Sequence, residues 1–498
     1  MPRWRPSDRL QDSPEARPLR PRNDRVTVAH WFDTAYADWL QLKSMGALAD
    51  AFSAAIVEDR SKEASMLARE IMRQRGQATP TLQKLAEAVL DKGRPEGGAG
   101  GARPDLKRIE VVRQAIAFFK KKTAIQPRNA FVWHDLSYNY LMLGEAEKAE
   151  RAMATALAVS GHHRLITRSA SRLYIHVRQP EKALSTLTLS RGFIGDPWLL
   201  SAHVAISQGS DKSSKFLKQA SALFETQPGR IESSELGMAL ATEAFLNGRA
   251  KVAKKLAKSA LIDPTENSLA QGVWISRKLN IDSMVADVSA TKDAYEAQAF
   301  DAYYRGEWKS SLESALAWLR DQPFSSRPAL LATFMAATFL RDFALSEEIA
   351  RFSLRTNTDD WMLTNNLIVA LAEQDKLQEA TELFTNLRVP GTKNREYATW
   401  LATGGLIRFR SGDAEGGRAL YGQSIEKSQE SGDRTSELVG ALYQSLEEAR
   451  IGETERAAKL LMDVRDHGSL DSRRSKDESA ALDVLNNEIH SLTVRRRS

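Results

Sequence analysis

The chain of 498 residues contains no cysteine. This absence excludes disulfides, zinc sites with cysteine ligands and thiol nucleophiles. A strong charge bias is also missing, because 70 Lys and Arg against 64 Asp and Glu give a formal net charge of only +6. Dedicated nucleic-acid domains are usually more basic and more clustered. Hydrophobic residues make up 42% and charged residues 27% of the chain, a balance that allows a substantial core.

Long apolar runs are absent too. The most apolar stretch, residues 329–340, lies between Pro328 and Arg341 and is shorter than the roughly 20 residues that a membrane span needs. We therefore expect a buried core helix there and no membrane span. The segment 1–25 carries positive charge, but no apolar segment follows it, so it does not form a secretory signal. We expect a cytoplasmic protein.

Catalytic and cofactor-binding motifs are also lacking. The sequence has no HExxH, no phosphate-binding loop, no dinucleotide-binding glycine pattern and no GxSxG elbow. His134 and Asp135 are neighbours on an expected helix, where adjacent side chains do not face each other. We therefore expect no enzymatic activity, no catalytic residue, no cofactor and no metal site. A site assembled from distant helices is the alternative that the sequence leaves open.

Composition divides the chain into five expected segments. A segment rich in Pro and Arg and without apolar periodicity is expected to be disordered. A segment rich in Gly and Pro is expected to be a linker. The predicted segments are a disordered basic arm (1–25), a helical segment (26–91), a linker (92–104), an array of paired amphipathic helices (105–470), and a capping helix with a basic tail (471–498).

The paired helices are clearest in residues 130–163. Trp133, Leu136 and Tyr140 lie three or four positions apart, so they share one helix face and form an apolar stripe. Gly144 follows where a sharp turn would need a left-handed backbone. A single hairpin cannot bury such a stripe, but stacked neighbours can.

Small residues recur at a fixed interval. Ala115, Ala149 and Ala183 are equally spaced along the chain, and Ser137 is small where the first helix would meet the second. These features together resemble the tetratricopeptide repeat (TPR) family, whose repeat length of about 34 residues equals the alanine interval. The resemblance implies an all-α fold, a right-handed α-α superhelical solenoid of helical hairpins. Residues 190–230 fit the pattern poorly, and Glu448 stands where an apolar residue belongs.

The resemblance also implies a groove. In TPR proteins the first helix of each pair lines a concave surface that binds a peptide or helix of a partner protein. The alternative is that several of the corresponding residues pack against adjacent repeats. The candidate groove residues are Phe131, His134, Asp135, Tyr138, Met142, Glu296, Phe300, Tyr303, Tyr304, Met335, Phe339, Asn365, Asn366 and Val369.

Lysines form a second candidate surface. Their spacing suggests two helical faces, and a basic face could attract nucleic acid or another polyanion. An ordinary solvated lysine face is the simpler explanation. We therefore favour a protein-interaction scaffold over a regulatory subunit that associates with nucleic acid or another polyanion through a basic convex face and the N-terminal arm. The lysines concerned are Lys212, Lys215 and Lys218 on one face, and Lys251, Lys254, Lys255 and Lys258 on the other.

Overall fold

The described part of the chain is all-α. The computed structural model describes residues 31–57, 60–78, 80–90, 109–160, 163–190, 192–279, 281, 285, 288–291, 293–394, 396–466, 483, 484 and 487. These residues form helices and turns without any β-strand, which confirms the predicted fold class. The predicted arm (1–25), the linker (92–104) and nearly all of the predicted cap, including Leu482, Leu485, Ile489 and Leu492, lie outside the described residues.

Two compact units make up the chain, Met1–Ala297 and Gln298–Ser498. The first contains α1 (Trp31–Leu42), α2 (Met45–Val57), α3 (Ser61–Arg73), α4 (Pro80–Leu90), α5 (Ile109–Ile125), α6 (Ala130–Met142), α7 (Ala146–Ser160), α8 (Arg164–His176), α9 (Pro180–Thr188), the 3₁₀ helix η4 (Phe193–Gly195), α10 (Pro197–Gly209), α11 (Leu217–Thr226), α12 (Ile231–Leu246), α13 (Ala250–Ala260) and α14 (Glu266–Lys278).

The helix α15 (Tyr295–Arg305) contains the division between the units. The second unit continues with α16 (Trp308–Asp321), α17 (Ser326–Phe334), the π-helix η6 (Met335–Phe339), α18 (Phe343–Leu354), α19 (Trp361–Glu373), α20 (Leu377–Asn386), α21 (Glu396–Arg410), α22 (Ala414–Ser431), α23 (Arg434–Ile451) and α24 (Thr454–Asp466).

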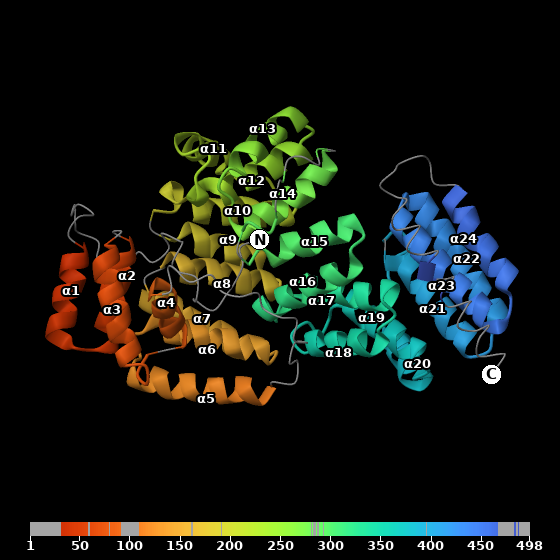
Figure 1. The fold of residues 1–498 in the computed structure, drawn as a ribbon, viewed down its shortest axis with the longest axis horizontal. Helices are drawn as coiled ribbons and strands as arrows, with labels where there is room; N and C mark the ends of the chain where they lie inside the picture. The colour runs from red at the N-terminus through yellow and green to blue at the C-terminus, as the bar shows by residue number, and fades with distance from the viewer. Residues whose placement is uncertain are drawn as a thin grey trace. The chain divides into compact units, whose positions relative to one another are not determined.

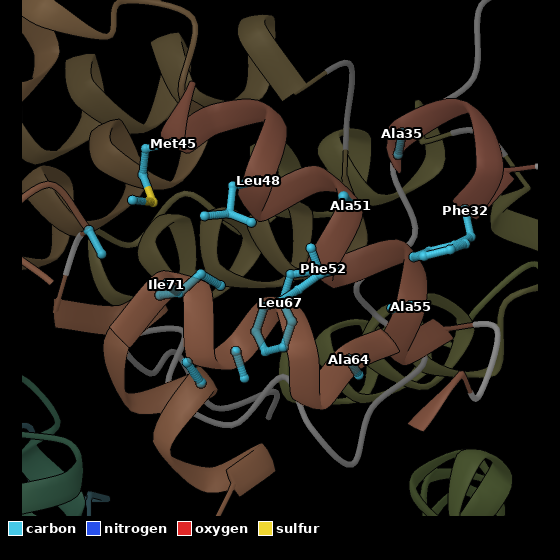
Figure 2. Close-up of a cluster of buried hydrophobic side chains, with 13 residues drawn as sticks. Phe32, Ala35, Met45, Leu48, Ala51, Phe52, Ala55, Ala64, Leu67 and Ile71 are labelled. Atoms are coloured by element: carbon cyan, nitrogen blue, oxygen red, sulfur yellow. The ribbon is translucent and has the colours of Figure 1, made fainter. Parts of the chain in front are cut away.

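The first four helices have a hydrophobic core of their own. Phe52, Leu67 and Ile71 are fully buried in a cluster that α1 to α4 share (Figure 2). Phe131 at the start of α6 and Leu165 on α8 pack against the same cluster. This part of the first unit therefore continues directly into the helical hairpins that follow it.

From α6 onward, many consecutive helices pair as hairpins, for example α6 with α7 and α21 with α22 (Figure 1), whereas α14 contacts α12. Gly144 closes the turn between α6 and α7 with a φ of 76°, as its position predicted. The Glu145 N–H donates to the carbonyl of Tyr140, 3.0 Å away, which is the six-residue closure of a helix C-terminus. Corresponding bonds close later hairpins, including Glu453 to Glu448 at 2.8 Å.

Within a hairpin, the two backbones approach closely at small residues. Ser137 Oγ on α6 donates to the Ala149 carbonyl of α7 at 2.6 Å, and Ala149 is fully buried. A similar contact runs in the opposite sense between α16 and α15, where Ser311 Oγ on the second helix donates to the Ala299 carbonyl on the first at 2.9 Å. The close approach expected from the sequence is therefore confirmed, and a hydroxyl–carbonyl hydrogen bond accompanies it.

The apolar stretch 329–340 is largely buried, as predicted, except at the exposed Leu340, but it is not a single α-helix. The chain is α-helical to Phe334 and then π-helical from Met335 to Phe339. The Leu340 N–H closes the wider turn on the Met335 carbonyl at 3.1 Å. Such a π-bulge changes which side chains point to each side of a helix, and Ala337 and Thr338 consequently line the cavity described below.

The structure explains why one segment and one residue fitted the repeat pattern poorly. Residues 190–230 do form a helix pair, α10 and α11, but a longer turn at 210–216 separates the two helices. Glu448 is fully buried because Arg418 forms two hydrogen bonds with its carboxylate, both 2.8 Å long. A paired glutamate thus occupies a position where an apolar residue was expected.

Candidate functional site

The inner helices of the second unit enclose a cavity of about 220 Å³. These are the first helices of successive hairpins, and each contacts the next: α17 with α19, α19 with α21, and α21 with α23. The lining residues are Thr333, Phe334, Ala337, Thr338, Met362, Asn365, Asn366, Val369, Thr399, Ala402, Thr403, Leu406, Tyr421, Ser424, Thr435, Ser436, Val439, Gly440 and Tyr443. None of these lining residues is charged.

Two asparagines on α19 present unpaired amide groups to the cavity. Asn365 Oδ1 accepts a hydrogen bond from Thr403 Oγ1 at 2.8 Å, and Asn366 Nδ2 donates to Thr333 Oγ1 at 2.8 Å. Asn365 Nδ2 and Asn366 Oδ1 form no hydrogen bond with the described residues. One free donor, on the side chain held by α21, and one free acceptor, on the side chain held by α17, thereby line the same cavity.

Two tyrosines belong to the cavity wall. Tyr421 on α22 is 1% exposed, and Tyr443 on α23 is 7% exposed. Burial raises the pKa of both hydroxyls, and nearby Glu447 and Glu373 add to the effect at Tyr421. Both phenols are therefore neutral at physiological pH and can donate a hydrogen bond. Tyr421 forms no hydrogen bond within the described part of the chain.

A cluster of buried charges joins the C-terminal ends of the same inner helices. Glu373 Oε2 lies 2.7 Å from Arg450 Nη2, 2.8 Å from Arg410 Nη2 and 3.3 Å from Arg341 Nη2. Arg410 Nε also lies 2.9 Å from Glu447 Oε2. Glu373 ends α19, Arg410 ends α21, and Glu447 and Arg450 lie in the last turns of α23. This Arg–Glu cluster therefore fixes the spacing of the helices that line the cavity.

In this cluster of three arginines and two glutamates, the pKa values of the two carboxyls shift in opposite directions. Burial would raise the pKa of Glu373, but Arg341, Arg450 and Arg410 together lower the pKa of this carboxyl below its ordinary value. At Glu447 the opposite holds, because burial outweighs the attraction of Arg450 and Arg410 and raises its pKa. Glu373 is thus the anion with which all three guanidinium groups form ion pairs.

Of the candidate groove residues, Asn365, Asn366 and Val369 line the cavity. Met335 is fully buried in the π-helix, one residue after the lining residue Phe334. Phe339 stacks on Trp308 with ring centroids 4.0 Å apart. The half-buried rings of Phe300, Tyr303 and Tyr304 contact one another on α15, where the partly buried Glu296 also lies.

The candidates on α6 occupy packing positions. Tyr138 is 6% exposed, Phe131 packs against the core of the first four helices, and Met142 is partly buried at the end of the helix. His134 is fully buried, with Nδ1 2.9 Å from Asp135 Oδ1 and Nε2 2.9 Å from Ser169 Oγ on α8. The expectation that His134 and Asp135 do not face each other is wrong, because their side chains bend toward each other.

This Ser169–His134–Asp135 arrangement has the connectivity of a hydrolase triad, and no sequence motif indicated it. Ser169 follows Asp135 by one repeat length and belongs to the next hairpin. A nucleophile must reach the substrate carbonyl, but Ser169 is 3% exposed and Asp135 is also 3% exposed. The hydrogen bonds therefore join α6 to α8 inside the core, where a substrate has no access.

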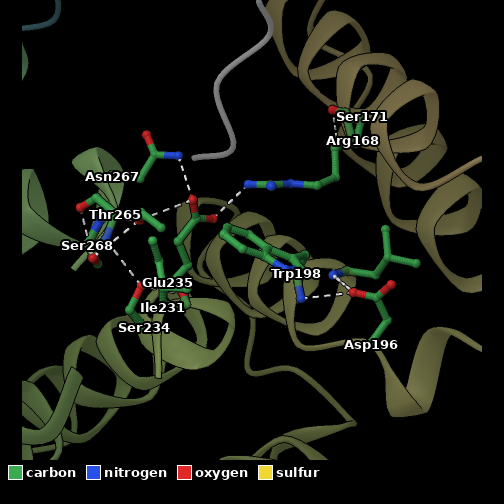
Figure 3. Close-up of polar contacts among 11 residues, drawn as sticks. Arg168, Ser171, Asp196, Trp198, Ile231, Ser234, Glu235, Thr265, Asn267 and Ser268 are labelled. Atoms are coloured by element: carbon green, nitrogen blue, oxygen red, sulfur yellow. Dashed lines mark hydrogen bonds and ion pairs between the residues drawn. The ribbon is translucent and has the colours of Figure 1, made fainter. Parts of the chain in front are cut away.

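A second buried polar contact joins helices of the first unit. Arg168 Nη2 on α8 lies 2.7 Å from Glu235 Oε2 on α12, and its guanidinium lies 4.9 Å from the Trp198 ring (Figure 3). Asn267 Nδ2 on α14 donates to the other Glu235 oxygen at 2.8 Å. Residues 67 positions apart form this ion pair, so no local motif could have predicted it.

Of the two expected lysine faces, the one on α13 is present in the structure, but the one at residues 212–218 is not. Lys251, Lys254, Lys255 and Lys258 are all exposed on α13. The helix α11 begins at Leu217, so Lys218 is helical while Lys212 and Lys215 lie in the preceding turn. These two lysines therefore share no helical face with Lys218. Lys212 also pairs with Glu181 at 2.5 Å, which reduces its local charge excess.

The fold and this cavity define a helical-repeat protein of stacked α-hairpins. No family model matches the chain, and no curated protein matches it. Among solved structures, it is similar to yeast Tom70, with 12% identity, 91% of this chain and 96% of that chain covered, and a TM-score of 0.28. It is also similar to the Cut9–Hcn1 hetero-tetramer of APC/C, with 14% identity, 93% of this chain and 99% of that chain covered, and a TM-score of 0.34.

Two further findings concern the described residues alone. Their helices include none with the length and apolar character needed to cross a membrane. Within the same part of the chain, no group of three or more His, Asp or Glu side chains is arranged to hold a metal ion.

Proposed function

We propose that this chain is a protein-interaction scaffold whose second unit binds a peptide or helix of a partner protein along its inner helices. The observation that carries the proposal is the cavity on these helices, into which Asn365 and Asn366 present a free donor and a free acceptor. Peptide groups carry one N–H donor and one C=O acceptor per residue. The two asparagines are complementary to that pattern.

The rigidity of the surrounding helices supports the proposal. The Arg–Glu cluster holds α19, α21 and α23 together through Glu373, Arg410 and Arg450. Thr403 and Thr333 hold the two asparagine side chains. Binding at a preorganised surface loses less conformational entropy than binding at a mobile one. The inner face therefore suits recognition of a partner segment.

The proposal can be tested with peptides selected from a random phage-displayed library on the full chain. The affinities of selected peptides would be measured by fluorescence polarisation for the wild type, Val369→Arg and Thr381→Arg. Val369 lines the cavity, whereas Thr381 is exposed on the outer helix α20. An arginine among uncharged lining groups would be desolvated without a partner, so Val369→Arg should weaken binding at least about tenfold.

Thr381→Arg adds the same charge on the opposite side of a hairpin and should leave the affinity within about twofold. If selected peptides bind Val369→Arg as tightly as the wild type, the inner helices are not their binding surface. If the library yields no peptide that binds the chain, the proposed function itself is contradicted.

A second function, association with nucleic acid or another polyanion, is favoured by one observation. Lys251, Lys254, Lys255 and Lys258 are exposed on α13 and form no ion pair with the described residues. Binding through such a surface weakens steeply as salt concentration rises. A single-stranded poly(U) RNA, titrated at low and at physiological salt, tests this function. An affinity that does not change with salt would reject it.

A further inference from the structure

We propose that the cavity of the second unit is an anchor site for one tyrosine or tryptophan side chain of the bound partner. This inference rests on the proposed function and specifies the chemistry of the partner. It follows from the volume, charge and polarity of the cavity, together with the hydrogen-bonding groups that the fold leaves unpaired there.

The volume suits one aromatic side chain. An apolar cavity of about 150 Å³ accommodates a benzene ring, and the cavity here measures about 220 Å³. The additional space is sufficient for a hydroxyl group or for the second ring of an indole. Small side chains such as alanine would leave most of it unfilled, and an unfilled cavity forfeits dispersion contacts.

The absence of charge among the lining residues excludes ionic anchors. Arginine, tyrosine and tryptophan are the side chains that most often dominate the binding energy of interfaces. A buried arginine or lysine needs an anion, and a buried aspartate or glutamate needs a cation. The nearby Arg–Glu cluster offers neither to a bound side chain, because none of its residues lines the cavity. Of the three common anchors, the two aromatic residues remain.

The wall of the cavity combines an apolar surface with isolated polar groups. Phe334, Val369, Leu406 and Val439 supply aromatic and aliphatic contacts from four successive inner helices. Tyr and Trp side chains are similarly composed of an apolar ring system and one hydrogen-bonding group, which needs a partner when it is buried. Phenylalanine lacks that group and would leave the polar lining atoms without a partner.

Two buried polar groups are available for that hydrogen bond. Asn365 is 3% exposed and Tyr421 is 1% exposed, and both line the cavity. Asn365 Nδ2 and the Tyr421 hydroxyl form no hydrogen bond with the described residues. Both atoms remain accessible from the cavity, so a bound side chain can reach them. Covering them without a hydrogen bond would be costly. A phenol can donate to Tyr421 or accept from Asn365, and an indole N–H can donate to Tyr421.

Side-chain analogues test the anchor site without the partner. Binding of p-cresol, 3-methylindole and toluene to the full chain would be measured by ligand-observed NMR, and the sites located by crystal soaking. We expect p-cresol or 3-methylindole in the cavity, at least about tenfold tighter than toluene, because toluene has no hydrogen-bonding group. If neither analogue binds in the cavity at millimolar concentration, the inference is overturned.

Two variants that fill the cavity provide the matched test. Ala402 lines the cavity and is half-buried, so Ala402→Phe and the milder Ala402→Leu should reduce analogue binding at least about tenfold. Thr381→Phe adds the same ring to an exposed outer position and should have no effect. Circular dichroism and thermal unfolding identify any variant that fails to fold. If a folded Ala402 variant binds the analogue as the wild type does, the cavity is not the site.

The selected peptides separate this inference from the proposed function. A tyrosine or tryptophan at one fixed position, whose replacement by alanine reduces affinity at least about tenfold, supports the anchor. Peptides that lose affinity for Val369→Arg but share no aromatic residue would overturn the anchor and leave the scaffold function intact.

Discussion

Gly405 of α21 lies directly against the ring of Tyr421 on α22: a Cβ atom built on Gly405 would be 2.7 Å from Tyr421 Cδ2. Tyr421 is 1% exposed, and its ring lies between Gly405 and the cavity. The absence of a side chain at Gly405 therefore determines how closely the two helices pack and where the tyrosine wall of the cavity lies.

Replacing Gly405 by alanine should lower the free energy of unfolding by about 1–3 kcal/mol, because the new methyl group overpacks the contact with Tyr421. Urea unfolding followed by circular dichroism measures the change. Gly422→Ala on the neighbouring helix α22 is the control, since a Cβ there would have no atom within 4 Å. That change should be neutral or stabilise the chain by up to about 1 kcal/mol. Equal effects at both glycines would contradict the described packing.

Ala149→Leu should cost about 1–3 kcal/mol of stability. Ala149 is fully buried where Ser137 Oγ bonds its carbonyl at 2.6 Å, so a larger side chain would force α6 and α7 apart. Ala154→Leu places the same side chain on an exposed position of α7 and should change stability by less than about 0.5 kcal/mol. Thermal unfolding compares the two variants. A neutral result for Ala149→Leu would mean that this contact does not control the hairpin.

Glu373→Gln should destabilise the second unit by about 3–5 kcal/mol, because it leaves Arg341, Arg410 and Arg450 without their shared anion. Asp375→Asn is the control, since Asp375 also pairs with Arg410 but its side chain is 79% exposed. Exposed pairs contribute about 0–1 kcal/mol. Urea unfolding at neutral pH measures both changes. Similar small losses for both variants would show that the cluster does not stabilise the inner helices.

The stability difference between the wild type and Glu373→Gln should depend on pH. The folded-state pKa of Glu373 lies below its ordinary value of 4.5, so the native carboxyl binds fewer protons than the unfolded one. Its contribution is therefore complete above the unfolded pKa and declines as pH falls through the folded pKa. Unfolding titrations from neutral pH downward should show the two proteins converging below about pH 4.5. A difference that grows with acidity would contradict the sign.

The Ser169–His134–Asp135 contact should act in stability and not in catalysis. Ser169→Ala removes the hydroxyl 2.9 Å from His134 Nε2 and with it a buried hydrogen bond, at a cost of about 0.5–1.5 kcal/mol. A fluorophosphonate probe should not label the native chain at Ser169, because this side chain is 3% exposed. Mass spectrometry after labelling checks the site. Covalent modification of Ser169 in the folded protein would contradict its assignment to the core.

Local features of this fold were predictable because nearby residues determine them. Gly144 has the left-handed backbone that its position in the pattern required, and Ser137 and Ala149 form the expected close contact. The cavity was predictable only through Asn365, Asn366 and Val369. Its remaining lining residues come from separate helices between Thr333 and Tyr443, and no local periodicity relates them.

Two other features escaped prediction for different physical reasons. The π-helix from Met335 shifts the register of the inner face, but its residues have the same apolar pattern as an ordinary helix. Buried ion pairs such as Arg168–Glu235 and Arg418–Glu448 resemble solvated charges in the sequence, because each partner lies in a different hairpin. That such a charge is buried can be recognised only when the three-dimensional positions of both partners are known.

Site-specific photo-crosslinking in the cell of origin tests most directly whether a partner segment lies on the inner helices of the second unit. The photoreactive amino acid p-benzoylphenylalanine would replace Val369 in the cavity lining, or Thr381 on the exposed outer face of α20. We predict a discrete crosslinked protein from position 369, lost when Ala402→Phe is added, and none from position 381. Crosslinking of the same partner from position 381 alone, or equally from both positions, would contradict the account.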